Sequence, residues 1–112
     1  LLRFNGIGSA DPAEAVRLVN HDNGQVVDVR EDSEWQRGHI PGAVHVPLSR
    51  LDKEMDKLGN PEAAEGPIVA ACRSGTRSTG AAVRLRKVGF QNVYNLNGGT
   101  TAWEQAGMPL EK

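Results

Sequence analysis

The sequence predicts an α/β fold in which helices cover both faces of a parallel sheet. Short apolar, β-branched runs typical of buried strands recur along the 112 residues, and segments with apolar residues at helical spacing separate them. Strand and helix patterns that alternate in this way are typical of parallel sheets, because each crossover helix packs against the sheet. The length fits a single domain, residues 1–112, in which residues 1–8 are expected to form a flexible N-terminal segment.

Local signals place the individual elements. Asp11 is typical of a helix cap, and the proline after it suits the first helical position. Apolar side chains fall on one face of residues 48–58, which predicts an amphipathic helix that Gly59 ends. In chain order, the predicted elements are a helix from Pro12, a strand over 25–30, a helical turn over 31–38, a strand over 43–46, a helix over 48–58, a strand over 67–71, a helix over 77–88, a strand over 93–96 and a last helical turn from Gly98.

The composition excludes several functional classes. The net charge is −1 and the basic residues are scattered, so we expect no nucleic-acid partner. A single cysteine cannot form an intramolecular disulfide, and the three histidines lack the spacing of metal ligands. We therefore expect no metal.

The sequence leaves the cellular compartment open. No apolar run approaches the roughly 18 residues that a membrane span needs, so the chain itself is not expected to cross a bilayer. It begins Leu1-Leu2-Arg3-Phe4 without a methionine, as a fragment or a processed form would. A cytoplasmic domain is expected, with or without attachment to a membrane anchor that is absent from this chain.

The single cysteine, Cys72, lies between a predicted strand and a predicted helix. The first N–H groups of a helix lack internal partners and carry the positive end of its dipole, so such a loop favours anions. A helix start and nearby guanidinium groups, here Arg73 and Arg77, lower a cysteine pKa from about 8.5 to roughly 3.5–7.5. Gly75 lets the backbone turn inward. The loop therefore predicts a reactive thiolate.

The alternative is that Cys72 is a small buried hydrophobe, the commoner role of a lone cysteine. The polar, doubly basic loop disfavours that interpretation. Three further hydroxyl groups in the loop add hydrogen-bond donors. They belong to Ser74, Thr76 and Ser78.

Other polar and aromatic residues have a structural and a functional interpretation. Asp28 and Arg30, near the end of a strand, either surround the active site or form a structural ion pair or helix caps; for direct chemistry the structural role is favoured. His39 and His45 are interpreted as hydrogen-bonded structural histidines, since their spacing sets up no relay to the cysteine. Trp103 is interpreted as core packing rather than as a ligand-stacking residue.

Three motifs follow one another along nearly the whole chain. They are residues 26–30 followed by Glu34-Trp35, 38–43 and Val46-Pro47; the loop 72–78; and Gly98-Gly99 with Ala102-Trp103. In this order they resemble the rhodanese-like sulfurtransferase domain, with one departure at His45, where the family often has asparagine. The resemblance implies a three-layer α/β/α sandwich around a mostly parallel five-stranded sheet.

The resemblance also implies a function, sulfur transfer through a persulfide on Cys72, which needs neither a metal nor an organic cofactor. The donor would be thiosulfate or a protein persulfide, and the acceptor cyanide or a thiol. Arg73, Ser74, Gly75, Thr76 and Arg77 would bind the anionic substrate. Four further residues would lie around this site: Asp28, Arg30, Trp35 and Ser78.

Two other functions compete with sulfur transfer. A cysteine phosphatase also uses a thiolate, an arginine and a helix start, but four residues separate Cys72 from Arg77 here, whereas the related phosphatases have five. A non-catalytic interaction or regulatory module is the second alternative, because a fold alone does not fix a function. The physiological donor and acceptor and the oligomeric state stay open.

Overall fold

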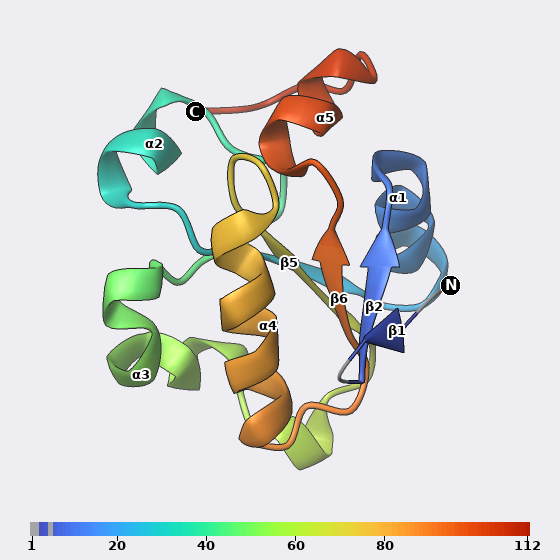
Figure 1. Ribbon diagram of the computed structural model, residues 1–112, viewed down its shortest axis with the longest axis vertical. Coiled ribbons are helices and arrows are strands. Elements are labelled where there is room, and N and C mark those ends of the chain that lie inside the picture. The colour runs from blue at the N-terminus through green and yellow to red at the C-terminus, as the bar shows by residue number, and fades with distance from the viewer. Residues whose placement is uncertain (1–2, 5) are drawn as a thin grey trace.

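A sheet of six strands, in the order β1-β2-β6-β5-β3-β4, forms the centre of the molecule (Figure 1). The structure, a computed structural model, describes residues 3–4 and 6–112. The five strands from β2 to β4 in this order pair in parallel, and β1 pairs with β2 in the antiparallel direction at the edge. The strands are β1 (Arg3–Phe4), β2 (Ile7–Ala10), β3 (Gln25–Asp28), β4 (Val44–His45), β5 (Ile68–Ala71) and β6 (Val93–Leu96).

Helical segments cover both faces of this sheet, which confirms the predicted three-layer fold. Helix α4 crosses in front of the sheet in Figure 1, and the segment with α3 packs on the same core cluster. Side chains of α1 and α5 belong to the cluster on the other face. The α-helices are α1 (Pro12–His21), α2 (Asp32–Arg37), α3 (Leu51–Glu54), α4 (Thr76–Lys87) and α5 (Gly99–Gln105), and the 3-10 helices are η1 (Leu48–Arg50), η2 (Met55–Leu58) and η3 (Pro61–Ala63).

Strand β5 determines which way the cysteine points. It is buried throughout, with β3 on one side and β6 on the other. Successive side chains of a strand point to opposite faces. Accordingly Ile68, Ala70 and Cys72 join the core cluster beneath α4, whereas Val69 and Ala71 join the other cluster. The thiol therefore faces the start of α4.

The predicted helix over 48–58 is in fact three short segments, η1, α3 and η2. Its apolar face is retained, because Leu48, Leu51, Met55 and Leu58 all belong to one core cluster. An apolar pattern cannot separate α from 3-10 turns here, since both bring residues i and i+3 to nearly the same side.

The prediction of a flexible segment over residues 1–8 is wrong for Ile7 and Gly8. Both lie in β2, which pairs with β6, and Ile7 is buried. A Cβ atom at Gly8 would overlap the ring of Tyr94, so glycine permits close packing there. A short strand that contains glycine and serine has a weak sequence signal, and its partner strand stabilises it. Leu1, Leu2 and Asn5 lie outside the described residues.

The carboxyl ends of the parallel strands gather the polar loops at one end of the molecule. In Figure 1 this is the upper end, where α2, the loop before α4 and α5 lie together. Ligands of parallel α/β sheets collect at this edge. The cysteine loop therefore lies where such a fold places a site.

Candidate active site

Cys72 follows β5 directly and lies under a tight loop that leads into α4. Gly75 caps the helix with a φ of 99°, a left-handed conformation that glycine adopts without strain. That turn points the N–H of Gly75 at the cysteine sulfur, with a distance of 3.0 Å. The N–H of Ser78 donates to the same sulfur at 3.4 Å, and the Ser78 hydroxyl lies 3.3 Å from it.

This environment favours the anionic form of the sulfur. The Cys72 side chain is buried, and burial raises the pKa of its thiol. The donors around Sγ, which are the Ser78 hydroxyl and the N–H groups of Ser78, Ser74 and Gly75, lower that pKa by more. The thiol pKa therefore lies below its ordinary value, in the direction that the sequence predicts.

Helix α5 supports the loop from behind. The N–H groups of Thr100 and Thr101 donate to the carbonyl oxygens of Cys72 and Arg73, at 2.9 and 3.1 Å. A Cβ atom at Gly99, whose φ is +59°, would overlap both of those carbonyl groups. The Gly98-Gly99 motif thus has a local physical role, because it lets the α5 backbone approach the cysteine closely.

Asn95 of β6 contacts the loop from the sheet, and sequence reasoning missed it. Its Nδ2 donates to the carbonyl of Gly75 and to the hydroxyl of Thr79, both at 3.1 Å. Its Oδ1 accepts from the Ser78 hydroxyl at 2.5 Å. Asparagine is depleted in strands, so its presence between Tyr94 and Leu96 was the signal that could have found it.

The guanidinium of Arg77 is paired with a carboxylate from α2. Both terminal nitrogens of Arg77 donate to Glu34, each at 2.7 Å. This pair lowers the pKa of Glu34 to about 2 and raises the pKa of Arg77 above its ordinary value. The sequence predicts Arg77 as a substrate contact and includes Glu34 in a motif, but it does not pair the two residues, which lie 43 positions apart.

Arg73 has a different environment from Arg77. It is exposed, and among residues 3–4 and 6–112 no hydrogen bond or ion pair of its side chain is found. It borders a hollow of about 540 Å³ between α2 and α5, which Arg37 also lines. A larger hollow of about 610 Å³ lies beside α1 and residues 63–66, and no residue of the cysteine loop lines it. Arg73 is therefore the loop cation whose charge faces solvent.

The remaining predicted loop residues, Ser74 and Thr76, are exposed at the mouth of the loop. Their hydroxyl oxygens lie 3.4 Å apart. The six residues that follow Cys72 in the motif thus form the loop around its thiol, although each contributes differently.

Asp28 and Arg30 form a buried ion pair under α2. The guanidinium donates to both carboxylate oxygens of Asp28 at 2.8–3.0 Å, and also to the carbonyl of Gly38 at 2.7 Å. Their side chains are 0% and 7% exposed. No contact with Cys72 is found for either residue within the described parts of the chain, and the geometry matches the structural interpretation.

Trp35 of α2 lies between two histidine rings. Its ring centroid is 3.6 Å from that of His39 and 4.5 Å from that of His45, with the rings nearly parallel. His39 Nδ1 lies 3.1 Å from the carbonyl of Trp35, and His45 Nε2 lies 2.7 Å from that of Arg30. Both histidines therefore have the hydrogen-bonded structural role that the sequence predicts.

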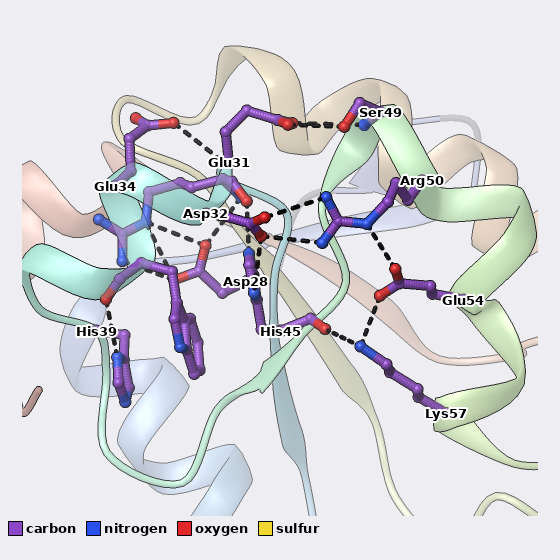
Figure 2. A network of polar contacts seen from close by, with 12 residues as sticks. Asp28, Glu31, Asp32, Glu34, His39, His45, Ser49, Arg50, Glu54 and Lys57 are labelled. Atoms are coloured by element: carbon purple, nitrogen blue, oxygen red, sulfur yellow. Dashed lines mark hydrogen bonds and ion pairs between the residues drawn. The ribbon is translucent and has the colours of Figure 1, made fainter.

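Polar contacts hold α2 on its other side as well (Figure 2). Arg50 pairs with Asp32 of α2 and with Glu54 of α3, and Lys57 also pairs with Glu54. Ser49 donates its hydroxyl to Glu31. Because none of the residues of α2 is buried, these contacts, the stacked rings and the Glu34 pair determine its position.

Trp103 of α5 packs in the core, as the sequence predicts. It is 7% exposed, and its indole N–H donates to the carbonyl of Pro109 at 2.8 Å. Within the described residues there is no group of three or more metal-ligating side chains, and no helix long and apolar enough to cross a membrane.

Comparisons with known proteins agree with this geometry. A family model described as rhodanese-like domain matches residues 11–106. The chain is 33% identical over 99 residues to the thiosulfate sulfurtransferase GlpE of Pseudoalteromonas translucida, an alignment that covers 84% of this chain and 86% of that protein.

Two solved structures are similar throughout the fold. The thiosulfate sulfurtransferase of Pseudomonas aeruginosa has a TM-score of 0.82 at 27% identity, over 95% of this chain and 19% of that one. A protein of unknown function from Rhodopseudomonas palustris, described as a possible tyrosine phosphatase, has a TM-score of 0.80 at 27% identity, over 99% of this chain and 96% of that one.

Proposed function

Because the chain belongs to the rhodanese-like domain family, we propose that it is a sulfurtransferase that carries sulfur as a persulfide on Cys72. One observation carries the proposal. The sulfur of the only cysteine accepts two backbone hydrogen bonds, from Gly75 and Ser78, inside a loop that ends at a helix start. Such a group of fixed donors stabilises a sulfur anion, either the thiolate or the outer sulfur of a persulfide.

The reaction proceeds in two displacements. The Cys72 thiolate attacks the outer sulfur of thiosulfate; the new S–S bond forms as the donor's S–S bond breaks, and sulfite leaves with the electron pair. Cyanide then attacks the outer sulfur of the persulfide, thiocyanate leaves, and the thiolate returns. A thiol acceptor in its thiolate form reacts in the same way and becomes a persulfide. Electrons and charge balance without an oxidant, and the exchange is of the ping-pong type.

The two loop arginines have different roles in this reaction. Arg73 is exposed and has no ion-pair partner among the described residues, so it attracts an anionic donor and offsets charge on the departing sulfite. Arg77 is already paired with Glu34, which compensates its charge. The guanidinium of Arg77 therefore chiefly fixes the loop against α2.

Burial of Cys72 restricts what reaches the sulfur. The residue is 0% exposed, with the backbone of the loop closed over it. A terminal sulfane sulfur is one atom wide, so only a small displacement of the loop is needed for it to reach the Cys72 sulfur. A protein persulfide presents the same terminal atom, and is the second class of donor.

The short loop also argues against phosphate transfer, although one similar structure is described as a possible tyrosine phosphatase. A phosphate monoester needs several donors around a tetrahedral group. Here the two N–H groups found at Sγ both lie against the sulfur itself. We infer that the loop suits one sulfur atom.

Intact-protein mass spectrometry tests the proposal. After incubation with thiosulfate we expect the mass of one added sulfur, and after cyanide we expect its loss. Cys72→Ser, which keeps the size of the side chain, should gain nothing while its circular dichroism stays unchanged. Sulfur transfer that survives in Cys72→Ser would remove Cys72 from the mechanism. A native protein that gains no sulfur from either thiosulfate or a persulfide donor would favour the interaction module.

A further inference from the structure

Asn95 lies at the centre of a small hydrogen-bond network under the cysteine loop. It is half-buried on β6 and contacts three different groups of the loop and of α4. Two of these groups, the Gly75 carbonyl and the Ser78 hydroxyl, belong to the residues whose N–H groups donate to the sulfur. Asn95 therefore acts on the Cys72 sulfur through Gly75 and Ser78, which lie between the two in this network.

The chemistry of its partners fixes the direction of each hydrogen bond. A carbonyl can only accept, so the side of Asn95 that faces Gly75 must be the amide nitrogen. The hydroxyl of Thr79 donates to the same carbonyl at 2.8 Å, which leaves its oxygen to accept from that nitrogen. The amide oxygen of Asn95 must then face Ser78, and it can only accept.

The hydroxyl of Ser78 thus has two acceptors and a single proton. The Asn95 oxygen lies at 2.5 Å and the Cys72 sulfur at 3.3 Å. The Asn95 oxygen lies closer than the sulfur, so it competes with the sulfur for this proton. A Ser78 hydroxyl that donates to Asn95 donates less strongly to Cys72.

We propose that Asn95 is a positioning residue for sulfur transfer: it competes with Cys72 for the Ser78 hydroxyl proton and thereby limits how strongly the resting thiolate is stabilised. The benefit of this arrangement rests on the proposed function. A moderately stabilised thiolate is a better nucleophile toward a sulfane sulfur than a strongly stabilised one. Its physical content, which is the competition for one proton, stands on the described contacts alone.

The test measures the thiol directly. The ultraviolet absorbance of the thiolate is followed against pH, with Cys72→Ser as the blank, and gives the pKa of the single cysteine without any sulfur donor. Asn95→Ala frees the Ser78 hydroxyl to donate to the sulfur, so we expect the thiol pKa to fall by about 0.5–1 unit, the size of one hydrogen bond. In a Ser78→Ala background the same replacement should leave the pKa unchanged, because no hydroxyl proton remains to be oriented.

A matched control separates this role from support of the loop. Thr79→Ala removes the other hydrogen bond to the Gly75 carbonyl without touching Ser78, and it should leave the thiol pKa where it is. An equal shift in Thr79→Ala, or equal shifts from Asn95→Ala with and without Ser78, would overturn the proposal. An unchanged or raised pKa in Asn95→Ala would overturn it as well.

A second variant keeps the test decisive if Asn95→Ala does not fold. Asn95→Asp has the same shape and offers Ser78 a stronger acceptor, so we expect the thiol pKa to rise, and to rise less when Ser78 is also replaced by alanine. Equal rises would overturn the proposal, since they would reflect the added charge alone. These absorbance results are independent of sulfur transfer, so failure of the proposed function would appear in the mass spectrum and not here.

Discussion

The guanidinium of Arg77 lies against the carboxylate of Glu34 with two parallel hydrogen bonds, each 2.7 Å long. This pair joins α4 to α2 beside the cysteine loop. Paired geometry of this kind is the strong form of an arginine–carboxylate contact. The charge of Arg77 is therefore compensated within the protein by Glu34.

Replacing Arg77 should therefore act through Glu34. In Arg77→Ala the unpaired carboxylate repels an anionic donor, so we expect the KM for thiosulfate to rise by about fivefold, equivalent to roughly 1 kcal/mol. Steady-state kinetics measure this. The double variant Glu34→Gln with Arg77→Ala should recover most of the loss, because the repelling charge is gone. An unchanged KM in Arg77→Ala would show that the pair is structural only.

The Glu34–Arg77 pair should make the unfolding free energy depend on pH in the acidic range. The folded protein lowers the pKa of Glu34 from 4.5 to about 2, so the stabilisation is fully present above about pH 4.5 and is lost as the pH falls toward about 2. With Arg77 37% exposed, solvent screening reduces the effect to about 1 kcal/mol. Urea unfolding of the native protein and of Glu34→Gln should differ near neutral pH and converge in acid. A difference that persists at about pH 2 would contradict this assignment.

Gly99 should be intolerant of any side chain. In Gly99→Ala the new methyl group meets the carbonyl groups of Cys72 and Arg73, and the backbone has a positive φ. We expect a loss of about 2–3 kcal/mol in unfolding free energy and at least a tenfold fall in sulfur transfer. Thermal unfolding and kinetics on one sample give both values.

Gly80 is the matched control for Gly99. A methyl group there meets nothing within 4 Å, and the residue lies in the middle of α4. Gly80→Ala should stabilise the protein by about 0.5–1 kcal/mol with sulfur transfer unchanged. Equal behaviour of the two alanine variants would show that the approach of α5 to the cysteine has no role.

The buried pair of Asp28 and Arg30 should be costly to break from one side. Arg30→Met leaves the Asp28 charge at 0% exposure without its partner, so we expect a loss of about 3–5 kcal/mol in urea unfolding. Arg37→Met, at an exposed position of α2, should change the unfolding free energy by less than about 0.5 kcal/mol. A small effect of Arg30→Met would mean that water reaches Asp28.

The cysteine loop could be predicted from the sequence because its parts are contiguous. Strand β5, Gly75 and the start of α4 follow one another, and local rules suffice to place Cys72 at the end of a strand. Strand β6 was predicted with its observed bounds for the same reason. The Asp28–Arg30 pair could be listed as an alternative, since only one residue separates its members.

The contacts that the sequence did not reveal join distant segments. Glu34 and Arg77 are 43 positions apart, and Asn95 is 17 positions from Ser78. No local pattern specifies such pairs, which depend on how α2 and β6 pack against the loop. Strand β2 was missed because most of its stability comes from pairing with β6 rather than from its own residues.

The contacts between α5 and the cysteine loop can form only late in synthesis of the chain. The N–H groups that bond to the carbonyls of Cys72 and Arg73 belong to Thr100 and Thr101, which are translated nearly thirty residues later than the thiol itself. A chain emerging from the ribosome would expose its cysteine before the backbone that fixes it exists. The backbone contacts that hold the cysteine loop are thus completed only when almost all of this sequence has been synthesised.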